Sequence, residues 1–264
     1  MKGVVFIFVL LCTGIGFCQN QKLIPTVLIS KPLIAEIFIG FDGLGNYYYI
    51  NNSVFTKQNN SKIWEYKNVA FGKITAVDII NPLKIVLFYE NFNVIITLDN
   101  QLNEIQKINL SDGNNNAIIA SRIGMASKNQ FWIFNTLNQQ IGLFDYLKNT
   151  YNPLGQPIQE TIKFSQSDFN YFSWIDSKNR LYSCDIFGKI NYITTVPQFD
   201  TFQIIDNNNF IFSKDKKLFV KNEITQTISE IQIFEKSFKN FYYKDQILAI
   251  FTNQVITNYK ITIP

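Results

Sequence analysis

The chain has 264 residues, of which 47% are hydrophobic, 16% aromatic and 17% charged, with a formal net charge of +4. Its apolar fraction suffices for a sizeable core, and its two arginines, Arg122 and Arg180, are too few to suggest a nucleic-acid partner, because bidentate guanidinium groups favour phosphate recognition. The chain has no histidine, which removes the commonest general base, the usual activator of Ser or Cys nucleophiles and the commonest metal ligand.

Residues 1–18 have the pattern of a secretory signal peptide. Lys2 gives a positive start, an apolar run follows, and Gly16 and Cys18 place small residues three and one before a predicted cut ahead of Gln19. The alternative is a lipoprotein signal with a lipid on Cys18, which the bulky Phe17 disfavours. No later segment approaches the roughly 18 apolar residues of a membrane span. We therefore expect an exported chain with one domain, residues 19–264.

After an N-terminal strand at Lys22–Ile29, short β-type runs and polar turns repeat six times. Aromatic and β-branched residues dominate these runs, as suits half-buried strands. The second strand of each repeat begins near residues 47, 85, 131, 181, 210 and 247, in steps of 29 to 50 residues. Such spacing is typical of four-stranded blades. The third repeat ends in an irregular stretch around Pro153 and Pro157, and the fourth is expected to start at Phe169.

These repeats predict an all-β fold, a six-bladed β-propeller. The last repeat has room for three strands only, and Lys22–Ile29 stands alone before the first repeat. We therefore expect the N-terminal strand to complete the last blade, which closes the ring and removes two open strand edges.

The turn Asp42-Gly43-Leu44-Gly45-Asn46-Tyr47-Tyr48 resembles the Asp-x-x-Gly-Asn-x-Tyr pattern of NHL-like and SMP-30-like propellers, and Asp176–Tyr182 is a weaker copy. These residues are a folding signature, since Asp and Asn fold back onto the backbone and Gly accepts a positive φ. SMP-30-like enzymes hold a divalent cation in the channel and open lactones. Oxygen ligands for such a cation could come from Asp78, Asn135, Asp176 and Asp206, although turn residues such as the last two usually close the turn.

One tip is singled out as an interaction loop: Glu90, Asn91, Phe92 and Asn93, between two strongly apolar runs. The polar stretch 112–116, with Asp112 and Asn114, is expected on the same face. Phe92 has two interpretations. It either folds over its own blade or the next, or it is an exposed aromatic anchor of the kind that dominates protein interfaces.

These observations favour an exported, non-catalytic propeller that binds an envelope or outer-membrane protein of a Gram-negative bacterium, in the periplasm or at the cell surface. We expect no catalytic residue, no metal, no other cofactor, no nucleic acid and no membrane span. Two alternatives stay open: an SMP-30-like metal-dependent hydrolase or lactonase, and a propeller that binds a carbohydrate or another small ligand.

Overall fold

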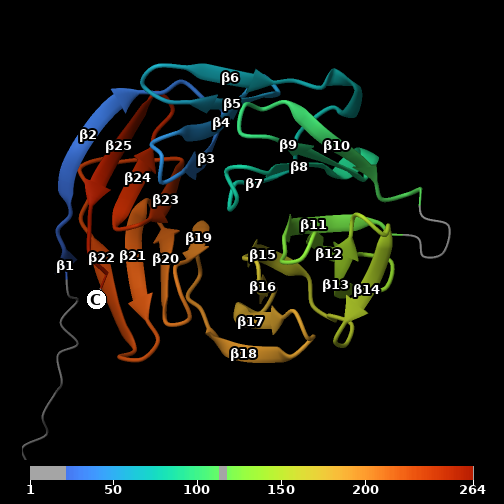
Figure 1. Ribbon diagram of the computed structural model, residues 1–264. Helices are drawn as coiled ribbons and strands as arrows, with labels where there is room; N and C mark the ends of the chain where they lie inside the picture. Colours follow the sequence, from blue (N-terminus) through green and yellow to red (C-terminus); the bar gives the residue numbers. More distant parts are fainter. Residues whose placement is uncertain (1–21, 113–117, 264) are drawn as a thin grey trace, which may run out of the picture.

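The computed structural model describes residues 22–112 and 118–263. Within them, twenty-five strands form six sheets arranged around a common centre (Figure 1). The fold is therefore a six-bladed β-propeller, as the sequence predicts. Two 3-10 turns, η1 (Val69–Phe71) and η2 (Glu90–Phe92), accompany the strands. No helix among the described residues is long and apolar enough to cross a membrane.

Each blade is a four-stranded antiparallel meander whose first strand lies nearest the centre and whose fourth lies at the rim (Figure 1). Blade one consists of β3 (Ile37–Phe41), β4 (Tyr47–Asn51), β5 (Val54–Gln58) and β6 (Ile63–Tyr66). Blade two consists of β7 (Ala76–Asp78), β8 (Ile85–Tyr89), β9 (Val94–Leu98) and β10 (Glu104–Asn109). Blade three consists of β11 (Ala120–Met125), β12 (Gln130–Asn135), β13 (Gln140–Asp145) and β14 (Thr150–Leu154). Blade four consists of β15 (Ile162–Ser167), β16 (Tyr171–Asp176), β17 (Arg180–Asp185) and β18 (Ile190–Thr195). Blade five consists of β19 (Thr201–Ile204), β20 (Asn209–Lys214), β21 (Lys217–Asn222) and β22 (Thr227–Ile231). Blade six consists of β23 (Asn240–Lys244), β24 (Ile247–Phe251), β25 (Val255–Lys260) and β2 (Thr26–Pro32).

The core lies between the blades, because successive side chains of a strand point to opposite faces. In β8, Ile85, Leu87 and Tyr89 pack toward blade one, whereas Val86 and Phe88 pack toward blade three. All five are fully buried or nearly so. The apolar run of this strand is thus continuous because both of its faces are covered.

The N-terminal strand closes the ring, with different bounds from those expected. The strand β2 pairs antiparallel with β25 and completes blade six. The segment before it, β1 (Lys22–Leu23), instead pairs parallel with β22 and adds a fifth strand to blade five. Pro25 separates the two pieces, since proline cannot donate to a strand ladder.

The sequence placed the start of the fourth blade one strand too late, because it missed the strands between residues 150 and 168. The Pro-bearing stretch contains a regular strand, β14, which tolerates Pro153 because it lies at the rim of its sheet. The fourth blade begins at β15, whose sequence Ile-Lys-Phe-Ser-Gln-Ser has little apolar content, and not at Phe169. The turn after Asp176 therefore joins the second and third strands of its blade.

Strand direction divides the connections between two faces of the ring. Turns between first and second strands, and between third and fourth strands, lie at one face, which we call the turn face. Turns between second and third strands share the opposite face with the links from blade to blade, and we call it the link face.

Side chains on the innermost strands tie neighbouring blades together. Gln166 of β15 accepts from the Ile204 N–H at 2.9 Å and donates to the Ile204 carbonyl at 2.8 Å. Gln203 of β19 bonds both backbone groups of Tyr243 at 2.7 Å in the same way. Each amide thus replaces the strand-to-strand pairing that is missing between blades.

Candidate functional site

The tip predicted as an interaction loop is a tight turn on the link face of blade two. The turn η2 spans Glu90–Phe92, and Asn93 ends it in the left-handed conformation, with φ 54°. Only 8% of Asn93 is exposed. Its Nδ2 donates to the Ile118 carbonyl at 2.6 Å, and its Oδ1 accepts from the Ala120 N–H at 3.0 Å. Asn93 is therefore a buried structural brace that fixes the end of the next blade-to-blade link.

Phe92 is half exposed, at 52%. Its ring meets Phe71 of η1 edge-on, with centroids 5.8 Å apart, and Phe71 in turn packs on Tyr89 at 5.5 Å. Val69, two residues before Phe71, is 78% exposed. Phe92 thus rests on the link from the preceding blade while it keeps an open face. One side of Phe92 packs, but on the link from the preceding blade and not over its own blade or the next, and its other side stays exposed.

A second asparagine braces the same link from blade three. The side-chain oxygen of Asn135 accepts from the Ile119 N–H at 3.0 Å and from the Leu137 N–H at 3.2 Å. The backbone N–H of Thr136 also donates to the Ile119 carbonyl, at 2.8 Å. Ile119 and Leu137 remain about half exposed, at 49% and 56%. The backbone is therefore held rigid under two open apolar side chains.

Five partly or largely exposed apolar residues lie on the link face of blades one to three: a ring contact joins Phe92 to Phe71, and Asn135 holds the backbone at Ile119 and Leu137. We call this set the Phe92 surface, and it comprises Val69, Phe71, Phe92, Ile119 and Leu137. Phe92 alone was predicted from the sequence. The other four lie in links or turns between the strands.

Asp112 was predicted together with Phe92, and its link lies beside the tip. Asp112 is exposed and accepts from the Asn109 side-chain amide at 2.7 Å. Its link is tied to the tip, because the Leu110 N–H donates to the Asn93 carbonyl at 3.0 Å. Asn114 lies outside the described residues. The Lys107 ammonium lies 5.8 Å from the Phe71 ring centroid and adds a positive charge beside the aromatic pair.

The four oxygen ligands considered for a cation do not converge. Asp78 and Asp206 lie at the turn-face ends of their strands, whereas Asn135 and Asp176 end second strands at the link face. Asp206 closes its own turn by accepting from the Asn208 and Asn209 N–H groups at 2.8 Å. Within residues 22–112 and 118–263, no three His, Cys, Asp or Glu side chains form a cluster suited to a metal.

Asp78 instead joins two inner strands. Its carboxylate accepts from the Ile80 N–H at 2.8 Å and from the Met125 N–H at 2.7 Å. Burial raises its pKa, although both hydrogen bonds act in the opposite direction. The carboxylate therefore links blade two to blade three by a hydrogen bond, as Gln166 and Gln203 link other neighbouring blades.

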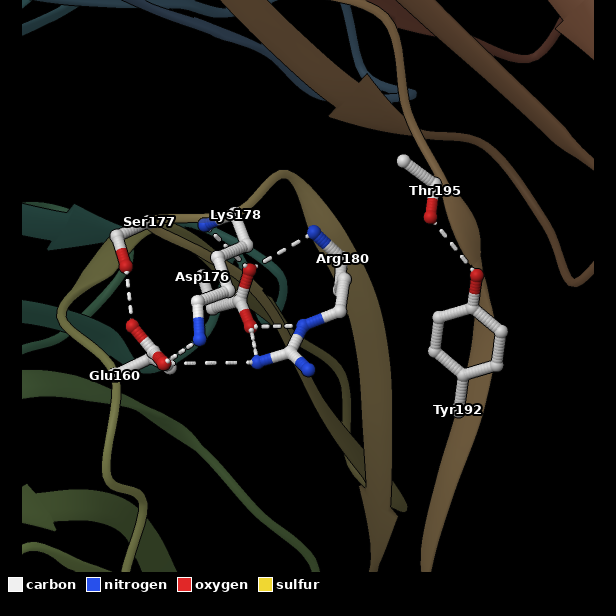
Figure 2. A network of polar contacts seen from close by, with 7 residues as sticks. All are labelled: Glu160, Asp176, Ser177, Lys178, Arg180, Tyr192 and Thr195. Atoms are coloured by element: carbon white, nitrogen blue, oxygen red, sulfur yellow. Dashed lines mark hydrogen bonds and ion pairs between the residues drawn. The ribbon is translucent and has the colours of Figure 1, made fainter.

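Asp176 is the centre of a polar network on the link face of blade four (Figure 2). It is 1% exposed, and it accepts from Nε and Nη2 of Arg180, each at 2.7 Å. Glu160 of the preceding link pairs with Lys178 at 2.5 Å and accepts from Ser177 at 2.7 Å, and these partners hold its pKa below the usual value. These hydrogen bonds and ion pairs fix the turn, and they engage the carboxylates of both Asp176 and Glu160.

The turn at Asp42, which carried the family resemblance, has a similar structural role. Asp42 accepts from the N–H groups of Leu44 and Asn46 and from the side chains of Asn46 and Tyr48, at 2.7 to 3.0 Å. Burial acts to raise its pKa, but these hydrogen bonds outweigh it and hold the pKa of Asp42 below the usual range. The motif is a folding signature, as expected.

Comparisons with known proteins agree with this fold. No protein-family model and no curated protein sequence matches the chain. Solved structures do match. BamB from Moraxella catarrhalis has a TM-score of 0.54 and 11% identity, over 90% of this chain and 100% of that chain. YCF48 bound to D1 peptide has a TM-score of 0.54 and 9% identity, over 85% of this chain and 77% of that chain, and a catalytically inactive His-to-Ala variant of virginiamycin B lyase from Staphylococcus aureus with quinupristin has a TM-score of 0.52 and 13% identity, over 89% and 99%. Identities this low show a shared propeller fold and nothing more.

Proposed function

We propose that the chain is an exported, non-catalytic β-propeller that binds another protein of a Gram-negative cell envelope through the Phe92 surface. The observation that carries the proposal is a set of exposed apolar side chains on the link face, of which Ile119 and Leu137 stand on backbone that the buried Asn93 and Asn135 hold by hydrogen bonds. Aromatic anchors on a rigid support lose little conformational entropy on binding, which is why such residues dominate interfaces. Export rests on the signal-peptide pattern of residues 1–18.

Two of the structural neighbours support protein binding over catalysis. YCF48 shows that a propeller of this shape holds a peptide. Virginiamycin B lyase was made catalytically inactive by replacing one histidine, and the 264 residues here contain no histidine that could take that role. The polar residues that might have formed a cation site are instead engaged in turns and blade contacts, as described above.

The test is co-purification from the envelope fraction of the organism that produces the protein. The affinity-tagged chain, a Phe92→Ala variant and a Phe234→Ala control are compared. Phe234 is 80% exposed in the link between blades five and six, so it matches Phe92 in residue type and face but lies outside the Phe92 surface. We expect Phe92→Ala to lose the partner at unchanged melting temperature, whereas Phe234→Ala keeps it.

Two results would overturn the proposal. Equal recovery of the partner by both variants would remove the Phe92 surface from the interface. A fall of several degrees in the melting temperature of Phe92→Ala, with binding intact, would mean that Phe92 packs on Phe71 for stability only.

A further inference from the structure

Three polar residues lie on the innermost strands of three different blades. Asp78 ends β7, Ser167 ends β15, and Tyr242 lies in β23. These strands are the ones nearest the centre of the ring (Figure 1). All three residues remain partly exposed, so solvent reaches them although they lie on the inner strands.

Gly124 of β11 brings the first two of these residues together. A Cβ at this position would overlap the Oγ of Ser167 and would lie 3.4 Å from the Oδ2 of Asp78. The hydroxyl from blade four and the carboxylate from blade two therefore stand over the same bare Cα in blade three. Any other residue at position 124 would displace Ser167, because the Ser167 Oγ takes the place of its Cβ.

Tyr242 reaches the same region from blade six. Its ring lies against Gly40 of β3, where a Cβ would be 3.0 Å from three atoms of the ring. Burial raises the pKa of the Tyr242 hydroxyl to about 12, and the negative charge of Asp78 contributes to this rise. The hydroxyl thus feels the Asp78 carboxylate across the centre of the ring, and a second glycine makes its approach possible.

The oxygen atoms of these side chains have hydrogen-bonding capacity left. Asp78 accepts from the Ile80 and Met125 N–H groups, which uses two of the roughly four lone-pair positions of a carboxylate. No lysine or arginine in the described part of the chain forms an ion pair with it. The hydroxyls of Ser167 and Tyr242 have no hydrogen-bond partner within residues 22–112 and 118–263. Because a buried carboxylate without a cation is costly, this arrangement favours a positively charged ligand.

We propose that Asp78, Ser167 and Tyr242 bind a primary ammonium group. Such a group has three N–H donors and one positive charge, and these side chains offer it one carboxylate and two hydroxyl oxygens as acceptors. A metal ion fits less well, since calcium takes about six to eight oxygen ligands and the described residues hold no cluster of three His, Cys, Asp or Glu side chains. The site does not depend on the Phe92 surface, which lies on the link face of blades one to three.

Isothermal titration calorimetry with propylammonium chloride tests this proposal. The wild-type protein should bind propylammonium saturably. It should not bind tetramethylammonium, which has the same charge but no N–H donor. The ammonium group is carried by a small free amine or by a lysine side chain, so Nα-acetyl-lysine amide is titrated in parallel. At least tenfold tighter binding of the lysine amide assigns the site to a lysine side chain, and any smaller difference assigns it to a free amine.

Three variants locate the binding. Asp78→Asn removes the charge and should weaken propylammonium binding about tenfold or more, because a charge-assisted hydrogen bond is lost. Ser167→Ala removes one acceptor and should weaken binding about threefold or more. Asp206→Asn is the matched control, since Asp206 also follows the turn-face end of an inner strand but accepts only within its own turn, and it should bind like the wild type.

The melting temperature of each variant shows whether it is folded, and Ser167→Ala decides the test if Asp78→Asn is not. A wild-type protein that binds neither amine would overturn the proposal. Equal binding of propylammonium and tetramethylammonium, wild-type affinity in Asp78→Asn and Ser167→Ala, or an equal loss of affinity in Asp206→Asn would also overturn it.

Discussion

Replacing Asn93 by alanine removes the brace beneath the Phe92 surface. The variant loses the donor to the Ile118 carbonyl and the acceptor for the Ala120 N–H, and each buried partner left unsatisfied costs about 1–3 kcal/mol. Alanine also tolerates φ 54° less well than asparagine, at a cost of about 1 kcal/mol. The total loss is about 3 kcal/mol or more. At about 2–4 °C per kcal/mol for a domain of this size, the melting temperature should fall by about 6–12 °C.

Asn52→Ala is the matched control for this measurement. Asn52 occupies the equivalent turn of blade one with φ 49°, but it is exposed. Its replacement should cost only the backbone preference, about 1 kcal/mol, or about 2–4 °C. Thermal unfolding followed by circular dichroism measures both variants. A fall for Asn93→Ala no larger than that for Asn52→Ala would refute the idea that the Asn93 side chain braces the link.

Three further predictions concern the fold. Asp42→Asn should lower the melting temperature at pH 7. Because the folded pKa of Asp42 lies below its unfolded value, the stability that the carboxylate supplies is present above about pH 4 and is lost as the pH falls through the folded pKa. A difference in melting temperature between variant and wild type that stays constant down to about pH 2.5 would contradict this. Deleting Lys22–Ile29 exposes the edges of β22 and β25 and should cause aggregation or a large fall in melting temperature; a monomer that melts like the parent would rule out the closure. Gln203→Ala removes both hydrogen bonds to Tyr243 and should lower the free energy of unfolding, measured by chemical denaturation, by about 1–2 kcal/mol. An unchanged free energy of unfolding would show that this contact between blades is dispensable.

Periodicity in the sequence was enough to predict the number of blades, because each strand alternates between two inter-blade cores. It failed where a strand has little apolar content. The strand β15 consists mainly of polar residues, and its Gln166 bonds the next inner strand in place of apolar packing. A pattern of apolar residues cannot detect such a strand, so the fourth blade was placed one strand late.

The candidate site was only partly predictable for a similar reason. Phe92 was identified as an apolar residue on a polar turn, but its contact with Phe71 joins residues from two blades. Asn93 was assigned to the interaction loop because polar turn residues are commonly exposed. Its burial follows from hydrogen bonds to residues 118 and 120, more than twenty positions away. Contacts over such separations depend on how the blades pack.

Site-specific photocrosslinking tests the central claim, that the Phe92 surface binds a protein partner, most directly. A photoreactive phenylalanine analogue replaces Phe92 in one variant and Phe234 in another, and each is irradiated in intact cells. Phe234 is the more exposed of the two, at 80% against 52%, so exposure alone favours crosslinks at position 234. The account predicts one discrete protein adduct at position 92 that Leu137→Ala weakens, and none at position 234. No adduct at position 92, or the same adducts at both positions, would contradict it.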